Sequence, residues 1–309
     1  MPSPSTRAVQ TAGVAYAGAA YLLWGVLPLY FLLLAPTGPW EVVAWRVLLS
    51  FVFCLLLLTV THGWAAFRAI VRQPKLLGWT ALAGLLIYVN WQVFVIGTLG
   101  GNVVETSLGY FINPITTVLL GVFVLKERIR RLQWAAVAIA AIAVVVIVVA
   151  YGEFPWIALS LTASFGVYGL IKKKIGPAVD AVSGLTLESF WLIPIAVVQL
   201  VVVAQTSGIT LGTSGWTHAL VLAFAGVATA VPLLLFAAGT RRINLTVIGM
   251  IQFITPVMQF LIGVAVLHEP MPAARWAGFV IVWIAIGVFL VDLLLAARRG
   301  RRIPRVAPA

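Results

Sequence analysis

Apolar runs long enough to cross a lipid bilayer recur along almost the whole chain of 309 residues. A helix needs roughly 20 residues to cross the hydrocarbon layer, and polar residues here gather in short breaks between the runs. A transmembrane β-barrel would instead show segments of about ten residues with alternating polarity. The sequence therefore predicts an all-α integral membrane protein. Ten transmembrane helices are expected, at residues 12–35, 40–61, 76–98, 103–125, 132–151, 156–174, 181–204, 217–240, 244–267 and 272–295.

The charged residues are few and unevenly placed. They make up 9% of the chain, against roughly 25% in soluble domains. With ten spans, all but two of the 20 lysines and arginines fall in loops or tails on one side; the exceptions are Arg46, inside the second span, and Arg275. Because positive loops stay in the cytoplasm, we expect a multi-pass protein of the cell membrane with both termini cytoplasmic. The bilayer explains the net charge of +12, so nucleic acid is not an expected partner.

The two halves of the chain match without a gap when Gly84 is aligned with Gly226. The same register aligns Phe94 with Phe236, Gly97 with Gly239, Pro114 with Pro256, Glu127 with Glu269 and Trp134 with Trp276. Each half holds five spans, an odd number, so the second half is expected to insert upside down as an inverted repeat. The predicted organisation is a cytoplasmic N-terminus (1–11), a first five-helix repeat (12–151), a second (156–295) and a basic cytoplasmic tail (296–309).

Two aligned spans each carry a polar stripe at helical spacing. The stripes comprise Tyr110, Asn113 and Thr117 in the fourth span and Gln252, Thr255 and Gln259 in the ninth. They predict the walls of a substrate cavity between the halves, and interhelical bonds that hold the bundle together are the alternative. Pro114 and Pro256 lie within these stripes. Each removes a backbone donor, so we expect hinges there, although proline also occurs in membrane helices for packing reasons.

Further polar and aromatic residues interrupt other spans. We expect Trp24, Asn90, Trp91 and Tyr168 to line the same substrate-binding cavity, with packed core as the alternative. Arg46 and Glu188 lie inside the second and seventh spans, at aligned positions. Charges at membrane depth mark ion paths, cavities or paired contacts. Each is therefore either a coupling residue, with Glu188 as a proton carrier, or a structural anchor.

Signatures of an enzyme are missing from the sequence. The chain contains no G-x-x-x-x-G-K-[ST] phosphate loop, and His268-Glu269-Pro270 does not extend to H-E-x-x-H. We therefore expect no catalytic residue, no metal and no cofactor, and the protein is not predicted to be an enzyme.

Several segments resemble the RarD-type permeases of the EamA family, in the drug/metabolite transporter superfamily. They are ETSLGYFINP at residues 105–114, KERIRRLQW at 126–134 and YGLIKKK at 168–174, together with Asn90-Trp91 and Glu188 followed by WLIP at 191–194. The resemblance implies ten helices, cytoplasmic termini and a central cavity formed by the first, third, fourth, sixth, eighth and ninth helices. One departure is Met250-Ile251-Gln252-Phe253, where the family tends to keep two aromatic residues beside the glutamine.

The expected function is that of a secondary transporter that moves a small organic metabolite or drug across the cell membrane by alternating access. A passive channel is the alternative, although no charged or carbonyl filter motif is evident. A membrane enzyme or a structural partner is a third hypothesis. The expected partners are a small-molecule substrate and the lipid bilayer. Proton coupling, direction of transport, substrate identity and oligomeric state stay open.

Overall fold

The computed structural model describes residues 4–126, 130–151, 154–240, 242–243 and 251–301. Within these residues every regular element is a helix. The helices are α1 (Pro4–Leu32), α2 (Pro39–Val60), α3 (Trp64–Val71), α4 (Pro74–Leu99), α5 (Val103–Leu125), α6 (Arg131–Tyr151), α7 (Trp156–Ile175), α8 (Ala181–Thr206), α9 (Trp216–Ala223), α10 (Ala225–Thr240), α12 (Ile254–Leu261), the π-helix η1 (Ile262–Val266) and α13 (Ala273–Arg301).

Eight helical segments are long and apolar enough to cross a membrane, and two further apolar helices, Trp156–Lys172 and Ile254–Val266, are shorter. An all-α membrane protein is therefore confirmed for the described part of the chain. The number of crossings stays a prediction, because the first part of the ninth expected span, at 244–250, lies outside the described residues.

Three boundaries differ from the expected spans. Helix α3 lies in a segment that was expected to be a loop. The eighth expected span is divided between α9 and α10 at Phe224. In the ninth, Gln252 and Phe253 form a turn before α12 begins. Pro256 then lies in the first turn of α12, where a residue without an N–H is tolerated.

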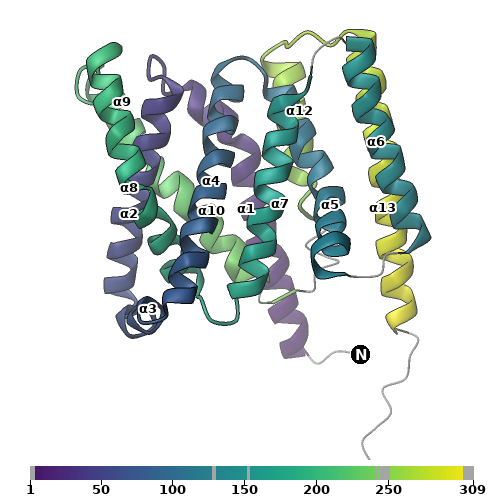
Figure 1. Ribbon diagram of the computed structural model, residues 1–309, viewed down its shortest axis with the longest axis horizontal. Coiled ribbons are helices and arrows are strands. Elements are labelled where there is room, and N and C mark those ends of the chain that lie inside the picture. The colour runs from purple at the N-terminus through teal and green to yellow at the C-terminus, as the bar shows by residue number, and fades with distance from the viewer. Residues whose placement is uncertain (1–3, 127–129, 152–153, 241, 244–250, 302–309) are drawn as a thin grey trace, which may run out of the picture.

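The helices pack as a bundle with α6 and α13 paired along one edge and α2, α8 and α9 at the opposite edge (Figure 1). The N-terminal end of α1 and the C-terminal end of α13 lie at the same end of the bundle (Figure 1). Between the edges, α1 packs against α10 and α12, and α7 packs against α4 and α5. These central helices surround the site described below.

Two carboxylates, the buried Glu269 and the partly buried Glu105, bind the N-terminal ends of neighbouring helices. Glu269 accepts hydrogen bonds from the amides of Val103 (2.6 Å) and Val104 (2.9 Å), where α5 begins. Glu105 in turn accepts from the amide of Ile157 (3.0 Å), where α7 begins. Amides in a helix's first turn have no partner within the helix, and the helix dipole favours a negative charge there. Burial raises the pKa of the Glu269 carboxyl, while these amide bonds and Arg275 oppose the rise.

Glycines allow four close helix contacts, and the four form two aligned pairs. A Cβ atom on Gly84 would lie 2.9 Å from the Glu188 carbonyl oxygen of α8, and one on Gly226 would lie 2.6 Å from the Leu49 carbonyl of α2. In the second pair, a Cβ on Gly97 would lie 2.7 Å from the methyl carbon of the Thr106 side chain, and one on Gly239 would lie 2.8 Å from the Ala17 backbone nitrogen. Helices approach this closely only where a side chain is absent.

We predict opposite effects for the same substitution at two positions of α4. Gly84→Ala should lower the free energy of unfolding by about 1–3 kcal/mol, because the new methyl group overlaps the α8 backbone. Gly78→Ala, where nothing lies within 4 Å of the added Cβ, should be neutral or stabilising by up to about 1 kcal/mol. The measurement is unfolding of the purified protein in detergent. Equal effects at both positions would contradict the close α4–α8 contact.

Candidate functional site

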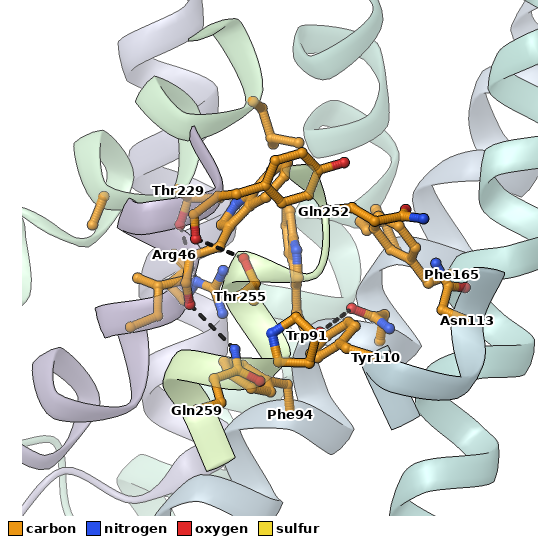
Figure 2. Close-up of a pocket in the computed structure, with 18 residues that line it drawn as sticks. Arg46, Trp91, Phe94, Tyr110, Asn113, Phe165, Thr229, Gln252, Thr255 and Gln259 are labelled. Atoms are coloured by element: carbon orange, nitrogen blue, oxygen red, sulfur yellow. Dashed lines mark hydrogen bonds between the residues drawn. The ribbon is translucent and has the colours of Figure 1, made fainter. Parts of the chain in front are cut away.

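A cavity of about 770 Å³, including the part that opens to solvent, lies between the central helices (Figure 2). Helices α1, α2, α4, α5, α7, α10 and α12, with the turn before α12, all contribute to its walls. The lining residues are Tyr21, Trp24, Leu27, Arg46, Ile87, Asn90, Trp91, Phe94, Tyr110, Asn113, Phe165, Ala228, Thr229, Leu233, Gln252, Thr255, Pro256 and Gln259.

Helix α12 is attached to α1 by side chains that bind the α1 backbone. Gln259 donates from Nε2 to the carbonyl oxygen of Trp24 (3.2 Å), and Thr255 donates to that of Tyr21 (2.6 Å). The Trp24 carbonyl lacks its regular helical partner, because the residue four positions later is Pro28. Gln259 therefore satisfies a carbonyl that the sequence of α1 leaves without a donor.

Prolines also leave a backbone carbonyl without its helical donor in two other walls of the cavity. Pro114 in α5 leaves the Tyr110 carbonyl without a regular helical donor, and Pro232 in α10 does so for Ala228. Tyr110 and Ala228 both line the cavity. Three helices thus leave a backbone acceptor without its helical donor at a residue that faces the site.

Asn90 organises the wall formed by α4, α5 and α7. Its Nδ2 donates to the Leu161 carbonyl (3.1 Å) and to Ser164 Oγ (3.3 Å), and its Oδ1 accepts from the Tyr110 hydroxyl (3.1 Å). The Tyr110 ring also packs edge-on against Phe165, with 6.2 Å between ring centroids. Asn90 is 2% exposed, so these bonds replace the water that a buried amide would otherwise need. They fix the tyrosine ring against the cavity.

Arg46 brings a positive charge to the cavity from α2. Its Nε donates to Thr229 of α10 (3.0 Å), and its guanidinium carbon lies 4.9 Å from the ring centroids of both Phe31 and Trp91. These contacts are cation–π interactions. The side chain is 3% exposed, and its Nη1 has no hydrogen-bond partner among the described residues.

Two amide oxygens in the walls also have no hydrogen-bond partner within the described part of the chain. They are Asn113 Oδ1 and Gln259 Oε1, both buried. A buried polar atom without a partner costs about 1–3 kcal/mol. The cavity therefore offers acceptors to a polar solute, alongside the donor on Arg46.

Most of the residues expected to bind substrate meet at this cavity. Those that line it are Trp24, Asn90, Trp91, Tyr110, Asn113, Gln252, Thr255 and Gln259. Thr117 and Tyr168 are not among the lining residues. Thr117 is exposed and donates to the Asn113 carbonyl of its own helix (2.9 Å). Of the two expected hinges, Pro256 lines the cavity, whereas Pro114 lies within the continuous helix α5.

Arg46 and Glu188 do not pair with each other, and only Arg46 lines the cavity. Glu188 accepts from Lys172 (2.6 Å) and from the Tyr168 hydroxyl (3.1 Å), so it joins α8 to α7. The carboxylate is 1% exposed, and the lysine side chain is 29% exposed. Removal of one partner from such a buried pair leaves an uncompensated charge.

Thr229, Tyr21 and Phe94 are lining residues that the sequence did not single out. Thr229 carries a usable signal, because it is the one side chain with a hydroxyl or amide group between His218 and Thr240. Tyr21 and Phe94 carry no such signal, since aromatic residues are equally frequent in packed cores.

The fold and the cavity define the chain as a multi-pass helical membrane protein with an internal cavity. The EamA-like transporter family matches residues 11–149. Protein RarD of Streptomyces exfoliatus is 41% identical over 300 residues, 97% of this chain and 95% of the relative. Protein RarD of Escherichia coli is 37% identical over 287 residues, 93% of this chain and 96% of the relative. The chain therefore belongs to the EamA family of transporters, as a RarD-type member.

One solved crystal structure also resembles the chain. It superposes with a TM-score of 0.59 at 16% sequence identity, and the match covers 93% of this chain and 98% of the solved one. At this identity the likeness shows a shared fold alone.

The bond between Gln259 and Trp24 can be tested by restoring the donor that Pro28 removes. Gln259→Leu should lower the free energy of unfolding by about 1–3 kcal/mol, because it leaves the Trp24 carbonyl unpaired. In a Pro28→Ala background the same change should cost about 1 kcal/mol less, since the substituted residue supplies a backbone N–H to that carbonyl. Unfolding of the four proteins gives this coupling directly. An identical cost in both backgrounds would contradict the role assigned to Gln259.

Proposed function

We propose that the protein is a secondary transporter that carries a small organic solute across the cell membrane by alternating access. The central cavity supports this proposal, because its walls combine aromatic rings with polar atoms of Arg46, Asn113 and Gln259 that have no hydrogen-bond partner among the described residues. Ligand sites that combine apolar and aromatic walls with a few polar groups hold small molecules. Family membership supports transport in general.

Alternating access further requires two halves that move against each other. We infer two inverted five-helix repeats, 12–151 and 156–295, with ten crossings. The aligned glycines support this inference, because Gly84 and Gly226 each contact the helix that the repeat assigns to them, α8 and α2. Helix pairs support it as well, since α1 with α10 and α4 with α7 are equivalent pairs under the repeat. Pro114 and Pro256 remain the proposed hinges.

The cytoplasmic side in this proposal is the end of the bundle at which α1 begins and α13 ends. Helix α3 lies at this same end of the bundle (Figure 1). Arg68 lies in α3, and Arg72 is the residue directly after this helix. Positive residues favour the cytoplasmic face, so the arrangement supports cytoplasmic termini and a basic tail at 296–309.

Proton coupling through Glu188 is the finer part of the proposal. Protonation of Glu188 would break its ion pair with Lys172 and remove one link between α7 and α8. A proton would in this way change the packing of α8 against α7, which lines the cavity. Tyr168, which also binds Glu188, is assigned to this link rather than to direct contact with the solute.

We predict that Asn113→Leu reduces solute flux at least about ten-fold, because it removes an amide that faces the cavity. Thr117→Val on the same helix should leave flux within about two-fold, since Thr117 does not line the cavity. The measurement is mass-spectrometric flux of a metabolite and drug panel through proteoliposomes. Saturable flux that falls in Asn113→Leu but not in Thr117→Val supports a transporter. Flux that does not saturate would favour a passive channel, and full activity of Asn113→Leu would remove the cavity from the mechanism.

The proton hypothesis has a separate test. Glu188→Gln should abolish the dependence of flux on an imposed pH gradient, because the amide cannot take up the coupling proton. Exchange of solute between the two sides without a gradient should persist. Unchanged pH-gradient dependence in a folded Glu188→Gln protein would make the residue a structural link between α7 and α8.

A further inference from the structure

Arg46 faces the cavity with a positive charge that no carboxylate of the described residues neutralises. Within that part of the chain, the ion pairs join Arg130 to Asp292 and Lys172 to Glu188. A charge at membrane depth is costly unless a partner compensates for it. The cavity therefore contains an unbalanced cation in a place where the protein gains from binding an anion.

The nearby acidic residues of the same region already have other partners. Glu41, on the same helix as Arg46, accepts hydrogen bonds from the amides of Thr210 (2.9 Å) and Leu211 (3.3 Å). Glu188 is bound by Lys172 (2.6 Å). Neither acid lines the cavity. The counter-charge for Arg46 must consequently come from outside these groups.

The contacts of Arg46 fix its guanidinium group in place but leave one of its nitrogens without a hydrogen-bond acceptor. Thr229 accepts from Nε, and Phe31 and Trp91 pack against the guanidinium group. Nη1, which has no hydrogen-bond partner among the described residues, lies on the terminal Nη1–Nη2 edge of the group, away from the Nε that Thr229 binds. In Figure 2 the Arg46 nitrogens point into the space beside Thr255. A fixed guanidinium edge is the geometry that binds a carboxylate through parallel, charge-assisted hydrogen bonds.

The remaining lining residues are neutral, and many are aromatic. Trp24, Phe94, Tyr110 and Phe165 line the cavity with Arg46. A single positive charge balances one negative charge, whereas a dianionic phosphate ester would bring a second charge without a partner. The rings favour an apolar or aromatic body over a bare inorganic anion.

We propose that the cavity binds a small organic monocarboxylate, with its carboxylate on Arg46 and its apolar or aromatic body against the rings of Trp24, Tyr110 and Phe165. This inference rests on the proposed function, because it assigns the substrate class of the same cavity. In this proposal Arg46 binds the substrate. It is then neither a coupling residue nor only a structural anchor.

The test compares matched ligands that differ in charge alone. Isothermal titration calorimetry of the purified full-length protein is performed with 3-phenylpropionate and benzoate and with the amide of each. The wild type should bind at least one carboxylate at least about ten-fold more tightly than its amide. In Arg46→Gln this ratio should fall to about one, while the exposed Arg72→Gln control keeps the wild-type ratio. Arg46→Lys keeps the charge and should retain part of the preference.

Four results would overturn the proposal. Three are equal binding of carboxylates and amides by the wild type, no binding of either carboxylate at millimolar concentration, and an unchanged ratio in Arg46→Gln. The fourth is binding of chloride or inorganic phosphate as tight as that of the carboxylates. The wild-type comparison remains decisive if Arg46→Gln fails to fold.

Binding and transport can fail separately. Carboxylate-selective binding without flux through proteoliposomes would contradict the transporter but retain the anion site. Saturable flux of a neutral solute, with no preference for carboxylates in binding, would contradict the anion site but retain the transporter.

Discussion

Every polar group placed inside this bundle needs a hydrogen-bond partner within the protein, because the bilayer supplies no water to it. The bonds from Gln259 and Thr255 to the α1 backbone meet this need, and so do the bonds of Asn90 to α7. They link helices far apart in the sequence around one central space. Among the described residues, three of the eight buried side-chain atoms without a hydrogen-bond partner belong to residues that line this space, namely Arg46, Asn113 and Gln259.

Close backbone contact is the second requirement for this arrangement. Gly84 and Gly226 let the α4 and α10 backbones approach α8 and α2. Carboxylates then hold the helix ends, with Glu269 at the start of α5 and Glu105 at the start of α7. The rigid contacts lie at these places, while the helices around the cavity carry prolines at positions 28, 114 and 232. A transporter needs both firm contacts between helices and helices that can deform.

The sequence predicts the membrane class and most of the cavity, because both depend on local patterns. Apolar runs indicate the helices, and the polar stripes at Asn113 and Gln259 indicate a helix face. Partners distant in sequence are less accessible. Arg46 binds Thr229 across the bundle, and Glu188 binds Lys172 on the neighbouring helix. No spacing rule predicts either pair, since each depends on how two helices rotate against one another. Thr117 shows the same limit, because a regular stripe placed it on the cavity face and the structure places it outside.

Sided labelling of the cavity tests alternating access most directly. Cys54 is the single cysteine of the chain, so Cys54→Ala gives a cysteine-free background for Ala228→Cys, at a residue that lines the cavity. A membrane-impermeant thiol reagent is then added to one side of sealed vesicles at a time. The account predicts labelling from either side, and protection from both sides by a transported solute. Labelling from one side alone under every condition, with or without solute, would contradict alternating access.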